Sequence, residues 1–125
     1  MNNLTVPLTV AEYFAGIGLV KMGLEPCGWR VVFANDISEK KHEIYKAFFP
    51  DAERHYEIGD VFDLNPANIP ATMLATCSFP CVDLSLAGNM YGIDGKHSSA
   101  FWGFVKALTA QSTAAPPIIH VENVP

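Results

Sequence analysis

The sequence predicts an α/β fold: a Rossmann-like, mainly parallel sheet with helices on both faces. Five short apolar runs rich in β-branched residues alternate with three segments that have helical features, and this alternation is typical of βαβ units. Half of the residues are hydrophobic and only 17% are charged, which favours a buried core over disorder. At 125 residues, close to the commonest domain size, we expect one domain over 1–125.

The predicted elements follow from local patterns. Ser38 is a good N-cap, Glu39 complements the first turn, and Pro50 stops the helix between them. A glycine-containing break at 14–18 separates the first strand from the first helix. Strands are expected at 8–14, 30–36, within 55–64 (ending at Gly59–Asp60), 73–79 and within 116–125, and helices at 18–25, 38–49 and 100–111, the last capped by Ser98 or Ser99.

Charge and cysteine content exclude several classes of protein. The net charge of −5 argues against a freestanding nucleic-acid-binding module, which would present a basic patch. Three cysteines without a CxxC pair predict neither a disulfide framework nor a zinc site, and we expect no metal. The first ten residues have no basic segment followed by an apolar run, so we expect no signal peptide, no membrane contact and a cytoplasmic location.

Acidic and glycine residues follow the predicted strands, at the edge where ligands bind in parallel sheets. The segment FAGIG at 14–18 ends one strand and opens a helix, although Lys21 breaks the full GxGxxG pattern. Asp36 closes the second strand, where an acid binds ribose hydroxyls in Rossmann units, and Asp60 closes the third. Alone, these residues could be a tight turn, a helix cap and a turn aspartate. Together they favour an adenosine-containing cofactor.

Cys81 is the candidate nucleophile. Pro80 fixes its own φ and keeps Phe79 extended, so the chain leaves the fourth strand in a stiff conformation. A thiol held in this way suits attack on one atom, provided that a positive charge favours the thiolate. The sequence leaves two candidates for that charge: His97 or a basic residue that is not among these 125. Cys77 lies inside the apolar run and suits a buried, inert role, and Cys27 has the neighbours of a turn residue.

Glu122 interrupts the apolar fifth strand, where a buried carboxylate must be paired or protonated. It is a candidate acid for a substrate ring, although a satisfied carboxylate at a strand end is the alternative. His120 alternates with Glu122 and is expected to be a packing or polar partner. The aromatic residues around the third helix have helical spacing and are expected to be mostly core: Phe101, Trp102 and Phe104.

In order, the motifs FAGIG, ND (35–36), GD (59–60), FPCVDLSLAG (79–88) and ENV (122–124) resemble those of the cytosine-C5 DNA methyltransferases. The resemblance covers about residues 8–125. It implies the methyltransferase variant of the Rossmann-like fold, the cofactor S-adenosylmethionine with product S-adenosylhomocysteine, and a role in DNA methylation of the restriction-modification type.

The resemblance also implies roles for individual residues. The cofactor would contact Phe14, Gly16, Ile17, Leu19, Asp36, Ile37, Asp60, Val61 and Pro80, and the substrate would contact Pro80, Ser85, Glu122 and Asn123. Cys81 and Glu122 would be catalytic: thiolate addition at C6 makes C5 of cytosine nucleophilic, and the acid holds the ring at N3. The substrate would be double-stranded DNA with the target cytosine flipped out.

The chain also departs from the family pattern. Leu19 stands where relatives often have glycine, and residues 97–100 read HSSA where many have an arginine-glycine pair. The arginine-bearing motif, the target-recognition region and the final helix of the family are not in these 125 residues. We therefore expect an N-terminal part of a catalytic domain, a fragment or split subunit that is inactive alone and acts with a complementary chain. The alternatives are an RNA (tRNA) cytosine-C5 methyltransferase and a non-catalytic module that binds S-adenosylmethionine or a partner.

Overall fold

A computed structural model describes residues 6–80 and 99–123 of the chain. It contains one five-stranded sheet in the order β3-β2-β1-β4-β5, in which every pair of neighbouring strands is parallel. The strands are β1 (Thr9–Tyr13), β2 (Arg30–Asp36), β3 (Tyr56–Ile58), β4 (Leu74–Cys77) and β5 (Ile118–Val121). The α-helices are α1 (Leu19–Leu24), α2 (Glu39–Phe48) and α3 (Ser99–Gln111).

The predicted fold class is confirmed, and every predicted strand and helix is present. The Ser38 hydroxyl caps α2 by accepting a hydrogen bond from the Lys41 amide at 3.2 Å. The third strand is shorter than its apolar pattern, because the chain turns into a 3₁₀ helix at Val61–Asp63. The structure describes α3 from Ser99 onward, and the other predicted cap, Ser98, lies outside the described residues.

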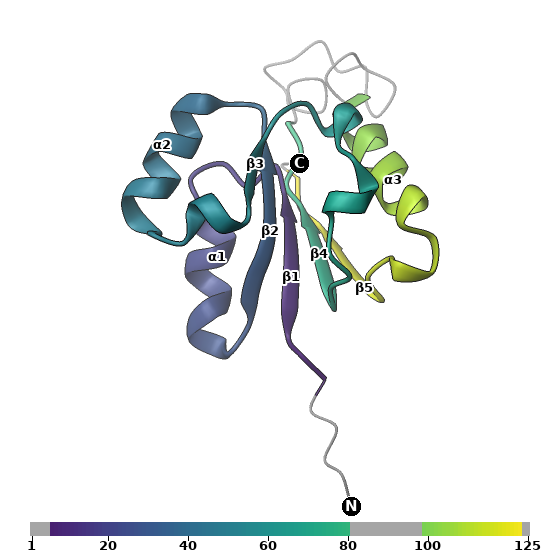
Figure 1. Ribbon diagram of the computed structural model, residues 1–125, viewed down its shortest axis with the longest axis horizontal. Coiled ribbons are helices and arrows are strands. Elements are labelled where there is room, and N and C mark those ends of the chain that lie inside the picture. Colours follow the sequence, from purple (N-terminus) through teal and green to yellow (C-terminus); the bar gives the residue numbers. More distant parts are fainter. Residues whose placement is uncertain (1–5, 81–98, 124–125) are drawn as a thin grey trace, which may run out of the picture.

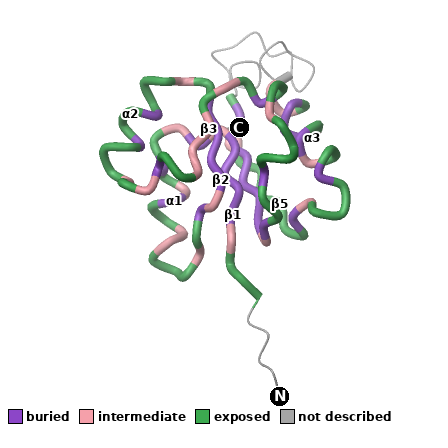
Figure 2. The backbone as a smooth tube through the Cα atoms, in the orientation of Figure 1, coloured by how far each residue is buried: buried purple, intermediate pink, exposed green. Residues whose placement is uncertain are grey.

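Helices cover both faces of the sheet, with α1 and α2 on one side and α3 on the other (Figure 1). Buried residues concentrate along the strands, and the outer sides of the helices are exposed (Figure 2). Two hydrophobic clusters result, one on each face. The α2 side contains Val10, Ala15, Val31, Ala34, Tyr45, Ala52 and Leu74. The α3 side contains Ala11, Tyr13, Phe33, Val61, Ile69, Ala75, Cys77, Phe79, Phe104 and Ala107.

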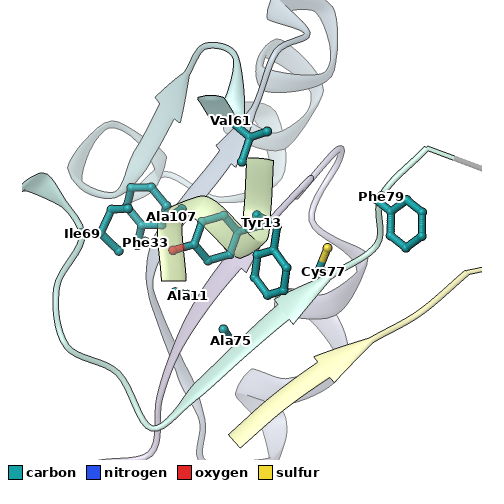
Figure 3. Close-up of a cluster of buried hydrophobic side chains, with 10 residues drawn as sticks. Ala11, Tyr13, Phe33, Val61, Ile69, Ala75, Cys77, Phe79 and Ala107 are labelled. Atoms are coloured by element: carbon teal, nitrogen blue, oxygen red, sulfur yellow. The ribbon is translucent and has the colours of Figure 1, made fainter. Parts of the chain in front are cut away.

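Tyr13 lies at the centre of the α3-side cluster (Figure 3). Its ring is 5.7 Å from that of Phe33 and 4.9 Å, edge-on, from that of Phe104. Successive side chains of a strand point to opposite faces, which is why Val10 and Ala11 belong to different clusters. The prediction that the aromatic residues of α3 are mostly core holds for Phe104. It is wrong for Trp102, which is 49% exposed.

The strand register aligns the carboxyl ends of the strands. Tyr13 is paired with Asn35 on one side and with Cys77 on the other, and Cys77 is paired with Val121. Phe14, Ser78 and Glu122 directly follow these strand ends. The register therefore brings the three residues to one edge of the sheet.

The described residues were also compared with the requirements for a membrane-spanning helix and for a metal site. Within 6–80 and 99–123, no helix is both long enough and apolar enough to cross a membrane. Nor does the described part of the chain contain a group of three or more His, Cys, Asp or Glu side chains placed to hold a metal ion.

Candidate functional site

The turn between β1 and α1 depends on left-handed backbone at three positions. Phe14 and Gly16 have φ of 56° and Gly18 has φ of 92°. At Gly18 no other residue would fit, because a Cβ atom there would lie 2.5 Å from the ring of Phe49 and 2.8 Å from that of Tyr45. Left-handed backbone is unusual for an aromatic residue, and the Phe14 side chain lines both cavities described below. The strained turn thus presents Phe14 at the carboxyl edge.

Asp36 connects this turn to β2. Its Oδ2 accepts a hydrogen bond from the Gly16 amide at 2.9 Å, and its Oδ1 accepts one from the Ser38 amide at 3.0 Å. Ser38 is the helix cap, so Asp36 is not required in that role. Each carboxylate oxygen has a second lone pair, so Asp36 can still accept hydrogen bonds from a pair of ligand hydroxyls.

A first cavity, of about 300 Å³, lies at the ends of β2 and β3; we call it the Asp36 cavity. It is lined by Phe14, Asn35, Asp36, Ile37, Ser38, Lys41, Gly59, Asp60, Val61, Ser78, Pro80 and Ala100. Ile37 is 68% exposed and offers an apolar surface at the cavity. Asp60 accepts a hydrogen bond from the Phe62 amide through Oδ1. The cavity therefore combines apolar surface with two carboxylates.

A second cavity, of about 510 Å³, lies at the ends of β1 and β5; we call it the Glu122 cavity. It is lined by Glu12, Phe14, Ala15, Gly16, Ile17, Leu19, Val20, Lys41, Ser78, His120 and Glu122. The two cavities share Phe14, Lys41 and Ser78 and so adjoin. Both volumes lie in or near the range of small-molecule sites, roughly 300–1,000 Å³.

Glu122 is held by backbone pairing beyond the end of β5. Its amide donates to the Cys77 carbonyl at 2.9 Å. The expectation that this carboxylate is buried in an apolar strand is wrong, because β5 is an edge strand and Glu122 and His120 are both exposed. Glu122 is therefore an exposed carboxyl group at the wall of the cavity.

Glu12 is the buried carboxylate of the site. It is 2% exposed, and its Oε2 atom has no hydrogen-bond partner among the described residues. Burial raises the pKa of Glu12 to about 8, although the nearby Lys21 ammonium and a hydrogen bond from the Val20 amide oppose the rise. Asp36 and Glu25 raise the pKa slightly further. Glu12 is therefore largely protonated at neutral pH.

Lys21 occupies the position where a third glycine would complete GxGxxG. Its side chain is 1% exposed and pairs with Glu25 and, at 3.3 Å, with Asp51. The ammonium also lies 5.0 Å from the centre of the Phe49 ring, in range of a cation–π interaction. Lys21 thus joins α1 to the residues after α2 and does not face a ligand.

The two cysteines that the structure describes have the environments that the sequence predicts. Cys77 is fully buried, and burial raises its pKa to about 12. Cys27 is exposed in a 3₁₀ turn, and its thiol lies 3.8 Å from the Gly23 carbonyl. Cys81 and Ser85 lie outside the described residues. Pro80, directly before Cys81, lines the Asp36 cavity.

The family described as C-5 cytosine-specific DNA methylase matches residues 8–125 of the chain. The chain belongs to this family. The predicted family is thereby confirmed, and the match covers nearly all of the 125 residues.

Individual relatives and one solved structure are similar to most of the chain. It is 31% identical to the type II methyltransferase M2.BsuMI of Bacillus subtilis (strain 168), over 94% of this chain and 29% of the relative. It is 26% identical to the type II methyltransferase M.HhaI of Haemophilus parahaemolyticus, over 94% of this chain and 34% of the relative. The crystal structure of S. pombe Dnmt2 methyltransferase is 27% identical, with a TM-score of 0.69 over 94% of this chain and 36% of that one.

These comparisons confirm the fold of the S-adenosylmethionine-dependent methyltransferases and, for the family, the predicted cofactor class. The chain spans about a third of the length of the curated relatives that it matches.

The residues present fit that cofactor. Adenosine needs acceptors for two ribose hydroxyls, an apolar surface for the base and an acceptor for the adenine amino group. At the Asp36 cavity, Asp36, Ile37 and Asp60 offer these three features. Phe14, Gly16, Ile17 and Leu19 line the adjoining cavity, on the side expected for the methionine part. The geometry is therefore compatible with one ligand that extends across both cavities.

The structure brings together ten of the predicted site residues at the two cavities: Phe14, Gly16, Ile17, Leu19, Asp36, Ile37, Asp60, Val61, Pro80 and Glu122. Asn123, predicted to contact the substrate, lines neither cavity and donates to the Phe79 carbonyl at 3.3 Å. The individual roles of these residues, and that of Cys81, remain predictions.

Sequence reasoning missed Glu12, Lys41 and Ser78. Glu12 interrupts the apolar run of the first strand in the same way as Glu122 interrupts the fifth, and that signal could have identified it. Ser78 directly follows the fourth strand, which also gives it a place at the carboxyl edge. Lys41 had no comparable signal, since its position depends on how α2 packs beside the glycine turn.

Proposed function

We propose that this chain is the part of a DNA cytosine-C5 methyltransferase that binds S-adenosylmethionine and supplies the nucleophile. The main support is the arrangement at the carboxyl edge. The hydrogen bond from the Glu122 amide to the Cys77 carbonyl fixes Glu122 beside the segment that leads to Pro80 and Cys81. Glu122 also lines the cavity that contains the glycine turn. A carboxylate, the approach to a thiol and a cofactor pocket thus adjoin.

The bound cofactor would supply a methyl group on a positively charged sulfur. The Cys81 thiolate adds to C6 of the flipped-out cytosine, and the electron pair of the C5–C6 double bond moves toward C5. Glu122 holds N3 and the exocyclic amine and so favours this shift, as a general acid would. After methylation, loss of the C5 proton restores the double bond and expels Cys81 as thiolate.

On the cofactor side, Asp36 accepts the ribose hydroxyls and Asp60 accepts from the adenine amino group. Ile37 and Val61 contact the adenine, while Phe14 and the glycine turn adjoin the sulfonium. Pro80 holds the entry to the Cys81 segment against the same cavity. Ser85 and Asn123 serve substrate binding in this proposal.

The remaining part of the catalytic domain, on a complementary polypeptide segment, is proposed to cover β5. Three apolar residues of this edge strand are about half exposed: Ile118, Ile119 and Val121. Beside them, a cavity of about 550 Å³ is lined by Val20, Gly23, Leu24, Leu74, Thr76, Ile118 and His120. An uncovered apolar edge strand is a favourable site for strand addition. The 125-residue chain alone is accordingly expected to lack methyl-transfer activity.

Covalent trapping tests the proposal. Duplex DNA containing 5-fluorocytosine is incubated with S-adenosylmethionine and the chain, co-expressed with the polypeptide that completes the catalytic domain. The fluorine cannot leave as a proton does, so a denaturation-resistant protein–DNA adduct should accumulate. The C81S variant should form none, while C27S, at an exposed turn, should react like wild type.

The other outcomes discriminate between functions. Adduct formation with 5-fluorocytosine RNA and not with DNA would indicate an RNA methyltransferase. Cofactor binding without any adduct, in the completed protein, would indicate a non-catalytic module. Methyl transfer to duplex DNA by the 125 residues alone would contradict the requirement for a complementary segment.

A further inference from the structure

Lys41 lies where the two cavities of the site adjoin. It is the only lysine or arginine among the described residues that line either cavity, and it lines both. Four acidic side chains line the same surfaces: Glu12, which is largely protonated, and Asp36, Asp60 and Glu122. One positive charge thus stands among acidic groups at the junction.

The position of Lys41 is fixed at the backbone, and its ammonium is not engaged in an ion pair. Its amide donates to the Ser38 hydroxyl, and its Cδ atom passes 3.9 Å from the place that a Cβ atom would take at Gly16. Within the described parts of the chain, no carboxylate lies within ion-pair distance of its ammonium. By contrast, Lys46 of the same helix pairs with Glu43 and Glu53.

The location is also unfavourable for a lysine without a ligand. Lys41 is in the first turn of α2, where the helix dipole disfavours positive charge. The first-turn acid, Glu39, already follows the usual preference. A cation at this point suits the recognition of an anionic group that lies over the glycine turn.

We propose that the Lys41 ammonium binds the α-carboxylate of the methionine part of S-adenosylmethionine. This inference rests on the proposed function. The cofactor carries two positive groups, the sulfonium and the α-ammonium, and one negative group, the carboxylate. The acidic lining complements the positive groups, and Lys41 is the described cation that can complement the negative one. The Lys41 side chain passes beside Gly16, which lines the Glu122 cavity, the cavity that we assign to the methionine part.

Isothermal titration with two ligands tests this assignment. S-adenosylmethionine and decarboxylated S-adenosylmethionine differ in the carboxylate alone. Lys41 is exposed, so K41M should weaken S-adenosylmethionine binding about three- to fivefold, the upper range for an exposed ion pair. The same change should leave the affinity for the decarboxylated ligand within about twofold, since no carboxylate interaction is lost. K41R should retain most of the affinity for S-adenosylmethionine.

K40M is the matched control, because Lys40 is the adjacent exposed lysine and lines neither cavity. It should change neither affinity. Equal weakening of both ligands by K41M, or no weakening of either, would overturn the assignment of Lys41 while the cofactor proposal stands. Failure of the wild-type protein to bind either ligand would overturn the cofactor proposal and this inference together.

Discussion

Oδ2 of Asp36 lies 2.9 Å from the backbone nitrogen of Gly16, a residue twenty positions earlier in the chain. The bond joins the end of β2 to the turn after β1. One side chain therefore orders the glycine turn and faces the cavity that we assign to adenosine. We therefore expect binding of the proposed cofactor and order in the turn to be coupled through this carboxylate.

This coupling predicts the effect of changes at Asp36. D36A should weaken S-adenosylmethionine binding at least about tenfold, because it removes charged acceptors and releases the Gly16 amide. D36N keeps the size of the side chain and one carbonyl acceptor, so its loss should be smaller. Titration calorimetry measures both affinities. D63N, at a carboxylate that lines neither cavity, should bind like wild type; wild-type affinity in D36A would refute the role of Asp36.

Gly18 should be nearly irreplaceable. G18A should lower the free energy of unfolding by about 2–5 kcal/mol, because its Cβ atom meets Phe49 and Tyr45 and its φ is 92°. Urea denaturation measures the change. G23A is the matched control: its Cβ atom would have no neighbour within 4 Å, and the helical position should gain about 0.5–1 kcal/mol. Similar effects of the two variants would contradict the packing around the turn.

Because of Glu12, the free energy of unfolding should decrease as pH rises. Its pKa in the folded protein, about 8, is above the ordinary value of 4.5, so the folded state binds a proton more tightly than the unfolded state. The protonated carboxyl therefore contributes fully below about pH 4.5. Its contribution decreases between about pH 4.5 and 8, with a slope of up to about 1.4 kcal/mol per pH unit.

Substitution isolates this contribution. E12Q cannot ionise and should remove much of the decrease in unfolding free energy between pH 5 and 8. E39Q, on the exposed side of α2, should retain the wild-type profile. The comparison requires urea denaturation at a series of pH values. Parallel profiles for wild type and E12Q would show that Glu12 is already charged at neutral pH in the folded protein.

The uncovered edge of the sheet yields a prediction about assembly. If β5 is at the centre of the proposed interface, I119K should weaken association with the proposed complementary segment by about tenfold or more. The chain itself should fold normally, because Ile119 is 50% exposed. I44K, at an exposed residue of α2, should associate like wild type. Analytical ultracentrifugation of the mixed polypeptides measures the affinity, and equal affinities would exclude β5 from the interface.

Most of the fold could be predicted because its signals are local. The β2 strand from Arg30 to Asp36 matches its apolar run residue for residue, and Ser38 caps α2 as its side chain predicts. The convergence of Asp36 and Glu122 follows from the rule that parallel strands share a carboxyl edge. These properties depend on residue type and order alone.

What could not be predicted depends on packing between distant segments. Lys41 enters the site because α2 packs beside the glycine turn, and Glu122 is exposed because β5 is an edge strand. The left-handed backbone of Phe14 is imposed by the turn, since the residue itself disfavours it. Trp102 has the helical spacing of a core residue but is 49% exposed.

The buried thiol of Cys77 can report how often the sheet opens. Its side chain is fully buried in the cluster on the α3 side, and its raised pKa keeps it in the unreactive thiol form. An alkylating reagent can reach it only when the central strands separate. The rate at which Cys77 is labelled therefore measures how often the sheet comes apart, and any ligand that binds the intact carboxyl edge should slow that labelling in proportion to its occupancy.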